Sequence, residues 1–220
     1  MIKIENTIVP SSDQWKSIIF GARNPLNSWD RSDTDFIPGF LMDDGTYIKG
    51  GPEFGPNDKD LMKRLRNAGT DHRKFMRMIT VYVDITAPLY FWKEFSTYKV
   101  GTVANSCSTM HKIHAKEFTL DDFSHYNLEP EMLAVLGVVI FALNAARDLY
   151  ISSKGKTDWW QMIQLLPSSY NQKRTVMLNY EVLANMYKSR KNHKLDEWRE
   201  LCEWMRGLPY SELITGEFDA

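Results

Sequence analysis

The stretch from Asn179 to Arg190 constrains the fold of this chain more than any other segment. Its apolar side chains recur at helical spacing and predict a helix with one buried face: Leu178, Val182, Leu183, Met186 and Tyr187. At ~100° per residue, Asn185 lies about 120° from Asn179, and Arg190 lies about 20° beyond Asn179. Two amides and a guanidinium along one side of a helix suit a flat heterocycle that carries an anionic group. The alternative interpretation is an ordinary solvated helix flank.

The N-terminal part mixes strand and helix patterns. Residues 1–9 alternate as a short strand, and Ser11 and Ser12 offer N-caps for a helix over about 13–22. Residues 24–58 are rich in Gly, Pro, Asp and Asn and show no sustained period, which predicts a long functional or mobile loop. A helix over 57–68 closed by Gly69 comes next, and then a half-buried strand over 76–86.

The remainder of the chain is mostly helical in pattern. Pro88 begins a helix that Gly101 breaks, and residues 102–108 form a loop or the start of the next element. Four more helices are expected at 131–153, which is long and largely buried, and at 157–166, 170–190 and 195–207. The sequence therefore predicts a helix-rich α+β fold in one domain covering 1–220.

Composition excludes several classes of function. A net charge of −1, from 27 basic and 28 acidic residues, argues against binding of nucleic acid or of a membrane surface. Two cysteines without a spacing pattern indicate a reducing compartment. The N-terminus lacks a signal peptide's apolar core, and the apolar run 132–146 is too short to span a bilayer. We expect a soluble, cytoplasmic protein.

The segment 102–109 concentrates hydroxyl and amide side chains around one thiol. Such groups hold a phosphate or the edge of a pyrimidine, although a Ser/Thr-rich turn with helix caps has the same composition. No His/Asp partner is spaced beside Ser108, so we interpret it as a substrate-orienting hydroxyl and not as a triad nucleophile. Cys107 is more typical of a small buried residue than of a nucleophile. His111, His114 and Glu117 have a conceivable metal-ligand spacing but lack a fourth candidate, and no metal is expected.

Two segments resemble signatures of the flavin-dependent thymidylate synthases. The stretch Asn179-x5-Asn185-x4-Arg190, followed by His193 and Trp198, is similar to the C-terminal signature of that family, and Leu166-Pro167-Ser168-Ser169-Tyr170 resembles its lead-in. Upstream, 88–108 resembles an apolar, Pro-led helix that runs into an Arg-His-Arg-x7-Ser motif, with Ser108 as the closing serine. His72, before an alternating strand, resembles the family's flavin-side histidine. The likeness covers roughly residues 70–200.

The chain departs from the family where anions are gripped. Thr97-Tyr98-Lys99-Val100 stands in place of Arg-His-Arg, with a one-residue ambiguity in the pairing. Met110 occupies another arginine position, and Glu94 stands where a substrate-facing glutamine is usual. Lysine does not replace the bidentate grip of arginine on a phosphate. Either nearby cations supply the charge from other positions (Lys99, Lys112, Lys173 and Arg174), or the activity has changed.

The resemblance implies a fold, a reaction and a site. It implies the family's helix-rich α+β fold with a small antiparallel or mixed sheet, in a homotetramer whose active sites draw on several subunits. The implied reaction is reductive methylation of dUMP to dTMP with FAD as cofactor and with methylenetetrahydrofolate and NADPH as co-substrates. The implied catalytic residues are Ser108 and Arg190. The implied substrate-binding residues are Glu94, Lys99, Ser106, Cys107, Ser108 and Arg190, and the implied cofactor-binding residues are His72, Tyr98, Lys99, Asn105, Asn179, Asn185 and His193.

Two alternatives remain open at this point. The lost Arg-His-Arg motif is compatible with a non-catalytic protein that binds a nucleotide or a flavin on the same fold. It is also compatible with an enzyme that modifies a different pyrimidine nucleotide or uses another carbon source. No Gly-x-Gly-x-x-Gly is present, so a Rossmann unit would not hold the flavin.

Overall fold

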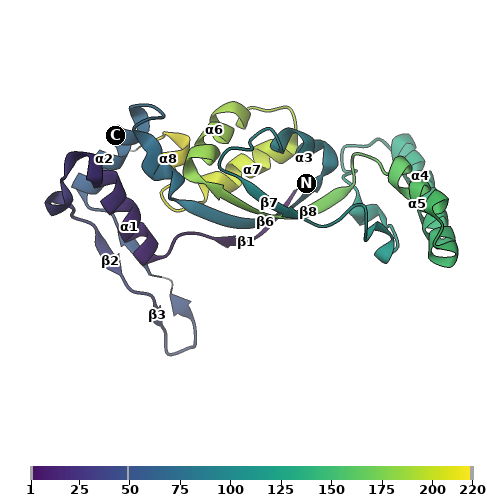
Figure 1. Ribbon diagram of the computed structural model, residues 1–220, viewed down its shortest axis with the longest axis horizontal. Helices are drawn as coiled ribbons and strands as arrows, with labels where there is room; N and C mark the ends of the chain where they lie inside the picture. The colour runs from purple at the N-terminus through teal and green to yellow at the C-terminus, as the bar shows by residue number, and fades with distance from the viewer. Residues whose placement is uncertain (1, 49, 219–220) are drawn as a thin grey trace. The chain divides into compact units, whose positions relative to one another are not determined.

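The computed structural model of the chain describes residues 2–48 and 50–218 (Figure 1). The chain forms two compact units, each assembled from separate segments. Unit 1 contains the residues up to 5 together with 84–97 and 104–175, and unit 2 contains 6–83, 98–103 and the residues from 176 onward. Each unit is described on its own.

The main sheet has four strands among the described residues, in the order β1-β6-β8-β7. The strands are β1 (Lys3–Ile8), β6 (Thr80–Pro88), β8 (Asn171–Asn179) and β7 (Val103–Ser106). The alternation expected for residues 76–86 is confirmed from Thr80 onward: Val81 and Val83 are buried while Tyr82 between them is 46% exposed. Residues 73–77 instead form a 3-10 helix, η3 (Arg73–Arg77).

Unit 2 begins with two capped helices. In α1 (Ser12–Arg23), Ser11 is the N-cap, as one of the two expected candidates, and it forms a capping box with Gln14. Helix α2 (Pro56–Asn67) ends before Gly69, whose φ of 103° is the left-handed conformation expected of it. A buried ion pair joins the two helices, because Arg23 Nε donates to Asp58 Oδ1 at 2.6 Å.

The segment between these helices is more ordered than a long loop. After two short 3-10 turns, η1 (Asn24–Leu26) and η2 (Trp29–Arg31), it forms two antiparallel ladders. Strand β2 (Asp35–Ile37) pairs with β5 (Gly51–Glu53), and β3 (Phe40–Leu41) pairs with β4 (Tyr47–Ile48). These strands are only two or three residues long, too short for a period to be visible in the sequence.

The prediction of a continuous helix over 170–190 was wrong. Residues 171–179 are strand β8, and the helix α6 (Tyr180–Arg190) begins only after it. Val176 and Leu178 are buried at a period of two, which the apolar pattern further along the chain obscured. The predicted helix over 195–207 is confirmed as α7 (Asp196–Arg206), and a short helix, α8 (Glu212–Thr215), follows. Helix α6 packs against α7, α8 and η3 in unit 2 (Figure 1).

Unit 1 contains the helices α3 (Leu89–Phe95), α4 (Pro130–Ser153) and α5 (Lys156–Leu165). Short 3-10 helices, η4 (Ile113–Ala115) and η5 (Leu120–Asp122), precede α4. The core of unit 1 collects buried side chains from these elements and from the segments between them: Ile113, Phe118, Phe123, Leu136, Leu143, Ala146 and Met162. Pro88 is the N-cap residue of α3 and does not lie in its first turn as expected.

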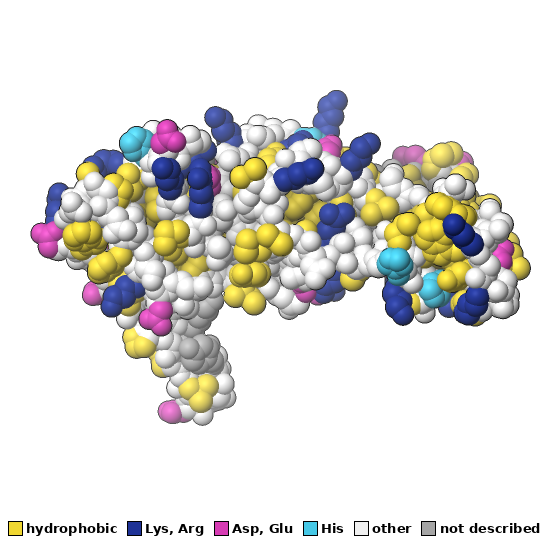
Figure 2. Space-filling model, in the orientation of Figure 1, with side chains coloured by type: hydrophobic (Ala, Val, Ile, Leu, Met, Phe, Trp, Pro, Cys, Tyr) yellow, Lys and Arg dark blue, Asp and Glu magenta, His cyan; other side chains and the backbone are white. Residues whose placement is uncertain are grey.

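Helix α4 is exposed, contrary to the prediction that it is largely buried. Only Leu136, Leu143 and Ala146 are buried, whereas Val138 is 68% and Phe141 75% exposed. Hydrophobic side chains gather over α4 and α5 in Figure 2. The helix has the bounds expected of it, since it continues past the apolar run 132–146 to Ser153, for 24 residues with a mean hydropathy of 1.8 over its most apolar part. By length and composition it could cross a membrane, which corrects the estimate made from residues 132–146.

Candidate functional site

In unit 2, Arg190 is held between two aromatic side chains. It ends α6, and its Nε donates a hydrogen bond to the hydroxyl of Tyr98 at 3.0 Å. Its guanidinium carbon lies 4.8 Å from the ring centre of Trp198 on α7 and 5.7 Å from that of Tyr98. Such cation–π contacts restrict the guanidinium to one orientation. The resemblance assigned Arg190 to the substrate, and here its fork is pre-positioned.

Asn179 caps the start of the same helix. It is the N-cap residue of α6, and its Oδ1 accepts from the backbone N–H of Val182 at 3.0 Å. Its Nδ2 lies 3.4 Å from the carbonyl oxygen of Gly101, at the edge of hydrogen-bonding range. Asn179 is only 9% exposed and its backbone is extended. The helical phase expected between Asn179 and the later polar residues therefore applies only to Asn185 and Arg190.

Asn185 lies on the solvent side of α6, within a charged network. Arg73 Nη2 donates to Asn185 Oδ1 at 3.1 Å, and Arg73 Nε donates to Glu181 at 3.3 Å. Arg77 also donates to Glu181. Burial alone would raise the pKa of Glu181, but the hydrogen bonds and charges of the two arginines lower it below its ordinary value.

A basic pocket of about 310 Å³ opens beside Asn185. Cationic side chains contribute to its wall: Arg66, Arg73, Lys188 and Lys191. Burial lowers the pKa of Arg66, and the nearby charge of Arg73 lowers it further. Arg66 also donates to the carbonyl oxygens of Leu213 and Ile214, at 3.1 Å each, so it terminates α8 as well. The pocket has the electrostatic character of an anion site.

The remaining predicted residues of unit 2 lie at its surface. His72 is exposed at the N-cap of η3, and Lys99 is exposed next to Tyr98. His193 follows α6 and is half-buried, and its Nδ1 accepts from the backbone N–H of Leu195 at 3.2 Å. Its ring is edge-on to Trp198 at 6.3 Å. The indole of Trp198 therefore contacts both Arg190 and His193.

The other predicted residues belong to unit 1. Asn105 and Ser106 end the exposed strand β7, and Cys107 and Ser108 follow it, also exposed. Ser108 Oγ accepts from the backbone N–H groups of His111 and Met110, at 2.8 and 3.1 Å. This is the turn-capping role that the composition also allowed, and it leaves the hydroxyl proton available to donate. The expectation that Cys107 is a buried residue was wrong, because β7 lies at the end of the sheet. Glu94 is half-buried near the end of α3.

Three residues of unit 1 form a connected group, of which the sequence analysis had named only Arg174, as one of several cations that could replace the missing arginines. Trp92 Nε1 on α3 donates to the carbonyl oxygen of Gln172 at 2.9 Å. The guanidinium of Arg174 lies 4.3 Å from the indole centre of Trp92, and its Nε donates to Gln172 Oε1 at 3.1 Å. Gln172 Nε2 donates to the carbonyl oxygen of Cys107 at 2.6 Å. The period of two between Gln172 and Arg174 was the signal, but it was assigned to a helix.

Among the described residues, no cluster of His, Cys, Asp and Glu has the geometry of a metal site. His111 and His114 do not converge with Glu117. His114 packs edge-on against Tyr150 at 4.9 Å, and its Nδ1 is buried without a hydrogen-bond partner.

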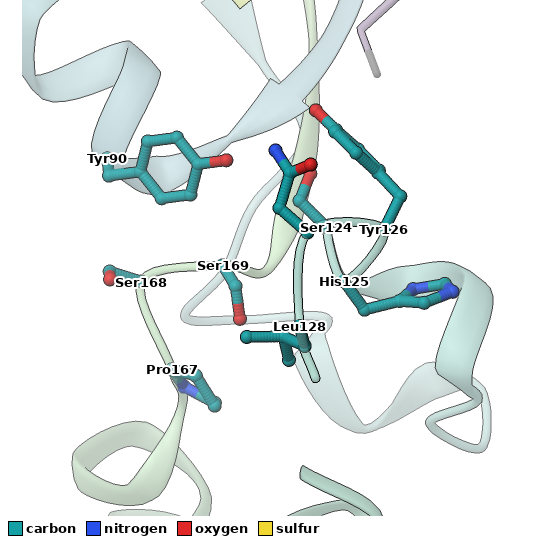
Figure 3. Close-up of a pocket in the computed structure, with 9 residues that line it drawn as sticks. Tyr90, Ser124, His125, Tyr126, Leu128, Pro167, Ser168 and Ser169 are labelled. Atoms are coloured by element: carbon teal, nitrogen blue, oxygen red, sulfur yellow. The ribbon is translucent and has the colours of Figure 1, made fainter. Parts of the chain in front are cut away.

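Unit 1 also contains a cavity of about 270 Å³ that the sequence did not indicate (Figure 3). Ser124 and Ser169 lie between Tyr90 and Tyr126 in this view, and Pro167 and Leu128 lie below them. Its wall is formed by residues 90, 124–128 and 167–169, so none of the predicted site residues lines it.

Comparison with solved structures identifies the fold. Two structures of thymidylate synthase X from Helicobacter pylori, both with FAD and dUMP, are 17% identical in sequence to this chain. One has a TM-score of 0.69 with 98% of each chain covered, and the other has 0.64 with 99% of each covered. The UMP/dUMP methylase PolB from Streptomyces cacaoi, bound with 5-Br dUMP, is 14% identical and has a TM-score of 0.60, with 98% of this chain and 95% of PolB covered. No protein-family model and no curated protein sequence matches the chain.

The chain therefore has the fold of the flavin-dependent thymidylate synthases, over nearly its whole length. The sequence prediction of a helix-rich α+β fold of this kind is confirmed. The structure places the predicted site residues in two groups. His72, Tyr98, Lys99, Asn179, Asn185, Arg190 and His193 belong to unit 2, and Glu94, Asn105, Ser106, Cys107 and Ser108 belong to unit 1.

Proposed function

We propose that this protein is a flavin-dependent enzyme that reductively methylates dUMP to dTMP, with methylenetetrahydrofolate as carbon donor and NADPH as reductant. The observation that carries the proposal is the fold likeness over 98% of both chains to a thymidylate synthase X solved with FAD and dUMP. The pre-positioned guanidinium of Arg190 supports it, because a rigid planar fork suits bidentate recognition of a nucleotide.

The residues of unit 2 fit an anionic flavin cofactor. FAD carries a pyrophosphate, and the basic pocket beside Asn185 offers it the charges of Arg66, Arg73, Lys188 and Lys191. Asn185 offers an amide to the edge of a flat ring. His72 precedes Arg73, and His193 follows Lys191 by two residues, so both histidines adjoin lining residues of the pocket in sequence. When bound, FAD supplies the redox chemistry, and the chain's residues hold and orient its ring.

The test is a direct assay of the purified protein with FAD, dUMP, methylenetetrahydrofolate and NADPH. We expect dTMP to form, and we expect omission of FAD to abolish it. The matched variant is Arg190→Lys, which keeps the charge but loses the planar fork, and which should lose most of the activity while unfolding at an unchanged temperature. A complete mixture that yields no methylated product from dUMP would exclude thymidylate synthesis.

A second candidate function is methylation of a different pyrimidine nucleotide. Tyr98 stands in place of part of the Arg-His-Arg motif, and PolB, with a TM-score of 0.60, is described as acting on both UMP and dUMP. Replacing dUMP by UMP in the same assay separates the two candidates. If the protein binds FAD and a nucleotide but methylates neither UMP nor dUMP, the non-catalytic interpretation holds.

We further propose that the protein works as a homotetramer in the cytoplasm. The apolar, exposed side of α4 supports association, because contiguous apolar surface of this kind is typical of interfaces. A partner chain that covers it would remove Val138 and Phe141 from water.

A further inference from the structure

Arg174 in unit 1 is a half-buried cation whose terminal nitrogens have no partner within the described part of the chain. Its Nε is bonded to Gln172, and one face of its guanidinium lies on the indole of Trp92. Neither Nη1 nor Nη2 makes a hydrogen bond or an ion pair with a described residue. Burial lowers the pKa of Arg174, and no nearby carboxylate offsets this effect.

Asp84, the carboxylate that contacts strand β8, binds residues on the face of the strand opposite to Arg174. Asp84 pairs with Lys173 at 2.9 Å and accepts from Thr175 Oγ1 at 2.6 Å. Because successive side chains of a strand point to opposite faces, Lys173 and Thr175 are turned away from Gln172 and Arg174. Glu94 follows Trp92 by two residues in α3, about 200° around the helix, so it too projects away from the face that holds Arg174.

The group around Arg174 is rigid and adjoins the segment that the sequence assigned to the substrate. Gln172 orients Arg174 and at the same time bonds to the carbonyl of Cys107, while the N–H of Cys107 donates to the carbonyl of Lys173 at 2.9 Å. Both backbone polar groups of Cys107, its N–H and its carbonyl, are thus hydrogen-bonded to residues of strand β8. The next residue is Ser108, whose hydroxyl proton remains available to donate.

We propose that Arg174 binds the phosphate monoester of the nucleotide substrate, with Trp92 and Gln172 as its positioning residues. This inference rests on the proposed function. A fixed guanidinium with two open N–H donors matches two oxygens of a phosphate, and its partial desolvation strengthens the pair. Arg174 thereby supplies the planar guanidinium that is missing where Lys99 and Met110 stand at the positions of the related family's arginines.

The experiment measures the binding of dUMP, deoxyuridine and inorganic phosphate to the full chain by calorimetry. The variants are Arg174→Gln and Arg174→Lys, and the control is Arg64→Gln, an exposed arginine paired only with Asp60 four residues away. Arg174→Gln should weaken dUMP and inorganic phosphate by about 10- to 150-fold, the range for a charged hydrogen-bonded contact, and leave deoxyuridine unchanged. Arg174→Lys should recover part of this loss, and it also serves if the glutamine variant fails to fold.

The outcomes separate this inference from the proposed function. If inorganic phosphate binds through Arg174 but dUMP binds no better than phosphate, the anion site stands and nucleotide methylation fails. If the preference for dUMP over deoxyuridine is the same in all variants, Arg174 has only a packing role and the inference is overturned. Absence of binding of both phosphate and dUMP to the unaltered protein overturns it as well.

Discussion

Tyr98 and Arg190 stand 92 positions apart, yet the hydroxyl of one is the hydrogen-bond acceptor of the other. The sequence identified Arg190 because it lies within a spaced polar signature on a helix. Tyr98 was assigned to the cofactor only through the family resemblance, at a position where the motif's arginine or histidine is missing, and nothing in the sequence linked it to Arg190. A contact between distant segments has no period to reveal it, so the substitution of Tyr98 acquires a meaning only in the folded chain.

The Tyr98 hydroxyl should contribute to nucleotide binding through Arg190. In Tyr98→Phe the ring stays under the guanidinium and only the hydrogen bond is lost, so we expect dUMP affinity to fall by about 3- to 10-fold, for a bond of roughly 1 kcal/mol. Calorimetric titration with dUMP measures the change. Tyr82→Phe, at an exposed tyrosine of β6, is the matched control and should bind like the parent. Equal dissociation constants for all three proteins would contradict this role.

Glu181 should make the stability of the fold depend on pH. Its pKa is lower in the folded chain than in the unfolded chain, so its stabilising effect is present above the unfolded value of about 4.3 and is lost as the pH falls through the folded value. Near neutral pH, Glu181→Gln should lower the free energy of unfolding by about 1–3 kcal/mol, because Arg73 and Arg77 lose their charged partner.

Denaturant unfolding at a series of pH values tests this expectation. The difference between Glu181→Gln and the parent should begin to shrink below about pH 4, and it should vanish once the pH has fallen through the lowered pKa of the folded carboxylate. Asp60→Asn removes an exposed pair with Arg64 and should cost only about 0–1 kcal/mol at any pH. A destabilisation by Glu181→Gln that persists unchanged into acid would show that packing, not charge, is responsible.

At the scale of secondary structure, the sequence predicted elements well where one period persisted over several turns. The helices α1, α2, α5 and α7 and most of strand β6 appear near their expected positions. The failures have physical causes. Strand β8 runs directly into α6, so two apolar periods merge without a turn residue between them. The apolar composition of α4 predicted burial, whereas the described part of the chain covers few of its side chains.

The candidate site was predictable only in its helical part. Asn185 and Arg190 lie on α6 as expected, whereas the group of Trp92, Gln172 and Arg174 depends on the packing of α3 against β8, which sequence periodicity does not specify. The neighbour of a strand is chosen by long-range packing, and the residues that it brings together are therefore hidden in the linear chain.

Gly101 is an element-level constraint at the approach to α6. Its φ is 87°, and a Cβ at this position would lie 2.7 Å from Asn179 Nδ2. Gly101→Ala should therefore destabilise the fold by about 1–3 kcal/mol through strain and displacement of the N-cap of α6. Gly137→Ala, within α4 and with open space around it, should instead stabilise by about 0.5–1 kcal/mol. Urea unfolding compares the two, and a Gly101→Ala chain as stable as the parent would contradict the constraint.

At the scale of the whole molecule, the exposed apolar side of α4 is the feature that a single chain does not explain. If it is a subunit contact, Phe141→Asp places a charge in that contact and should convert the tetramer into smaller species. Light scattering should give a mass that approaches the 25.6 kDa of one chain. Leu26→Asp, at a 61% exposed leucine outside α4, should leave the mass unchanged. A parent protein that is already monomeric at micromolar concentration would refute the tetramer.

The composition of unit 2 has a consequence for biosynthesis. The unit takes residues 6–83 from the beginning of the chain and needs everything from 176 onward to be complete. The backbone N–H of Tyr180 donates to the carbonyl of Ile79 at 3.0 Å, and the apolar side chains around Ile79 are fully buried only once α6 has been made. During translation these side chains stay exposed until about ninety further residues have left the ribosome. A chain interrupted before residue 176 should therefore associate with chaperones or aggregate instead of leaving a folded fragment.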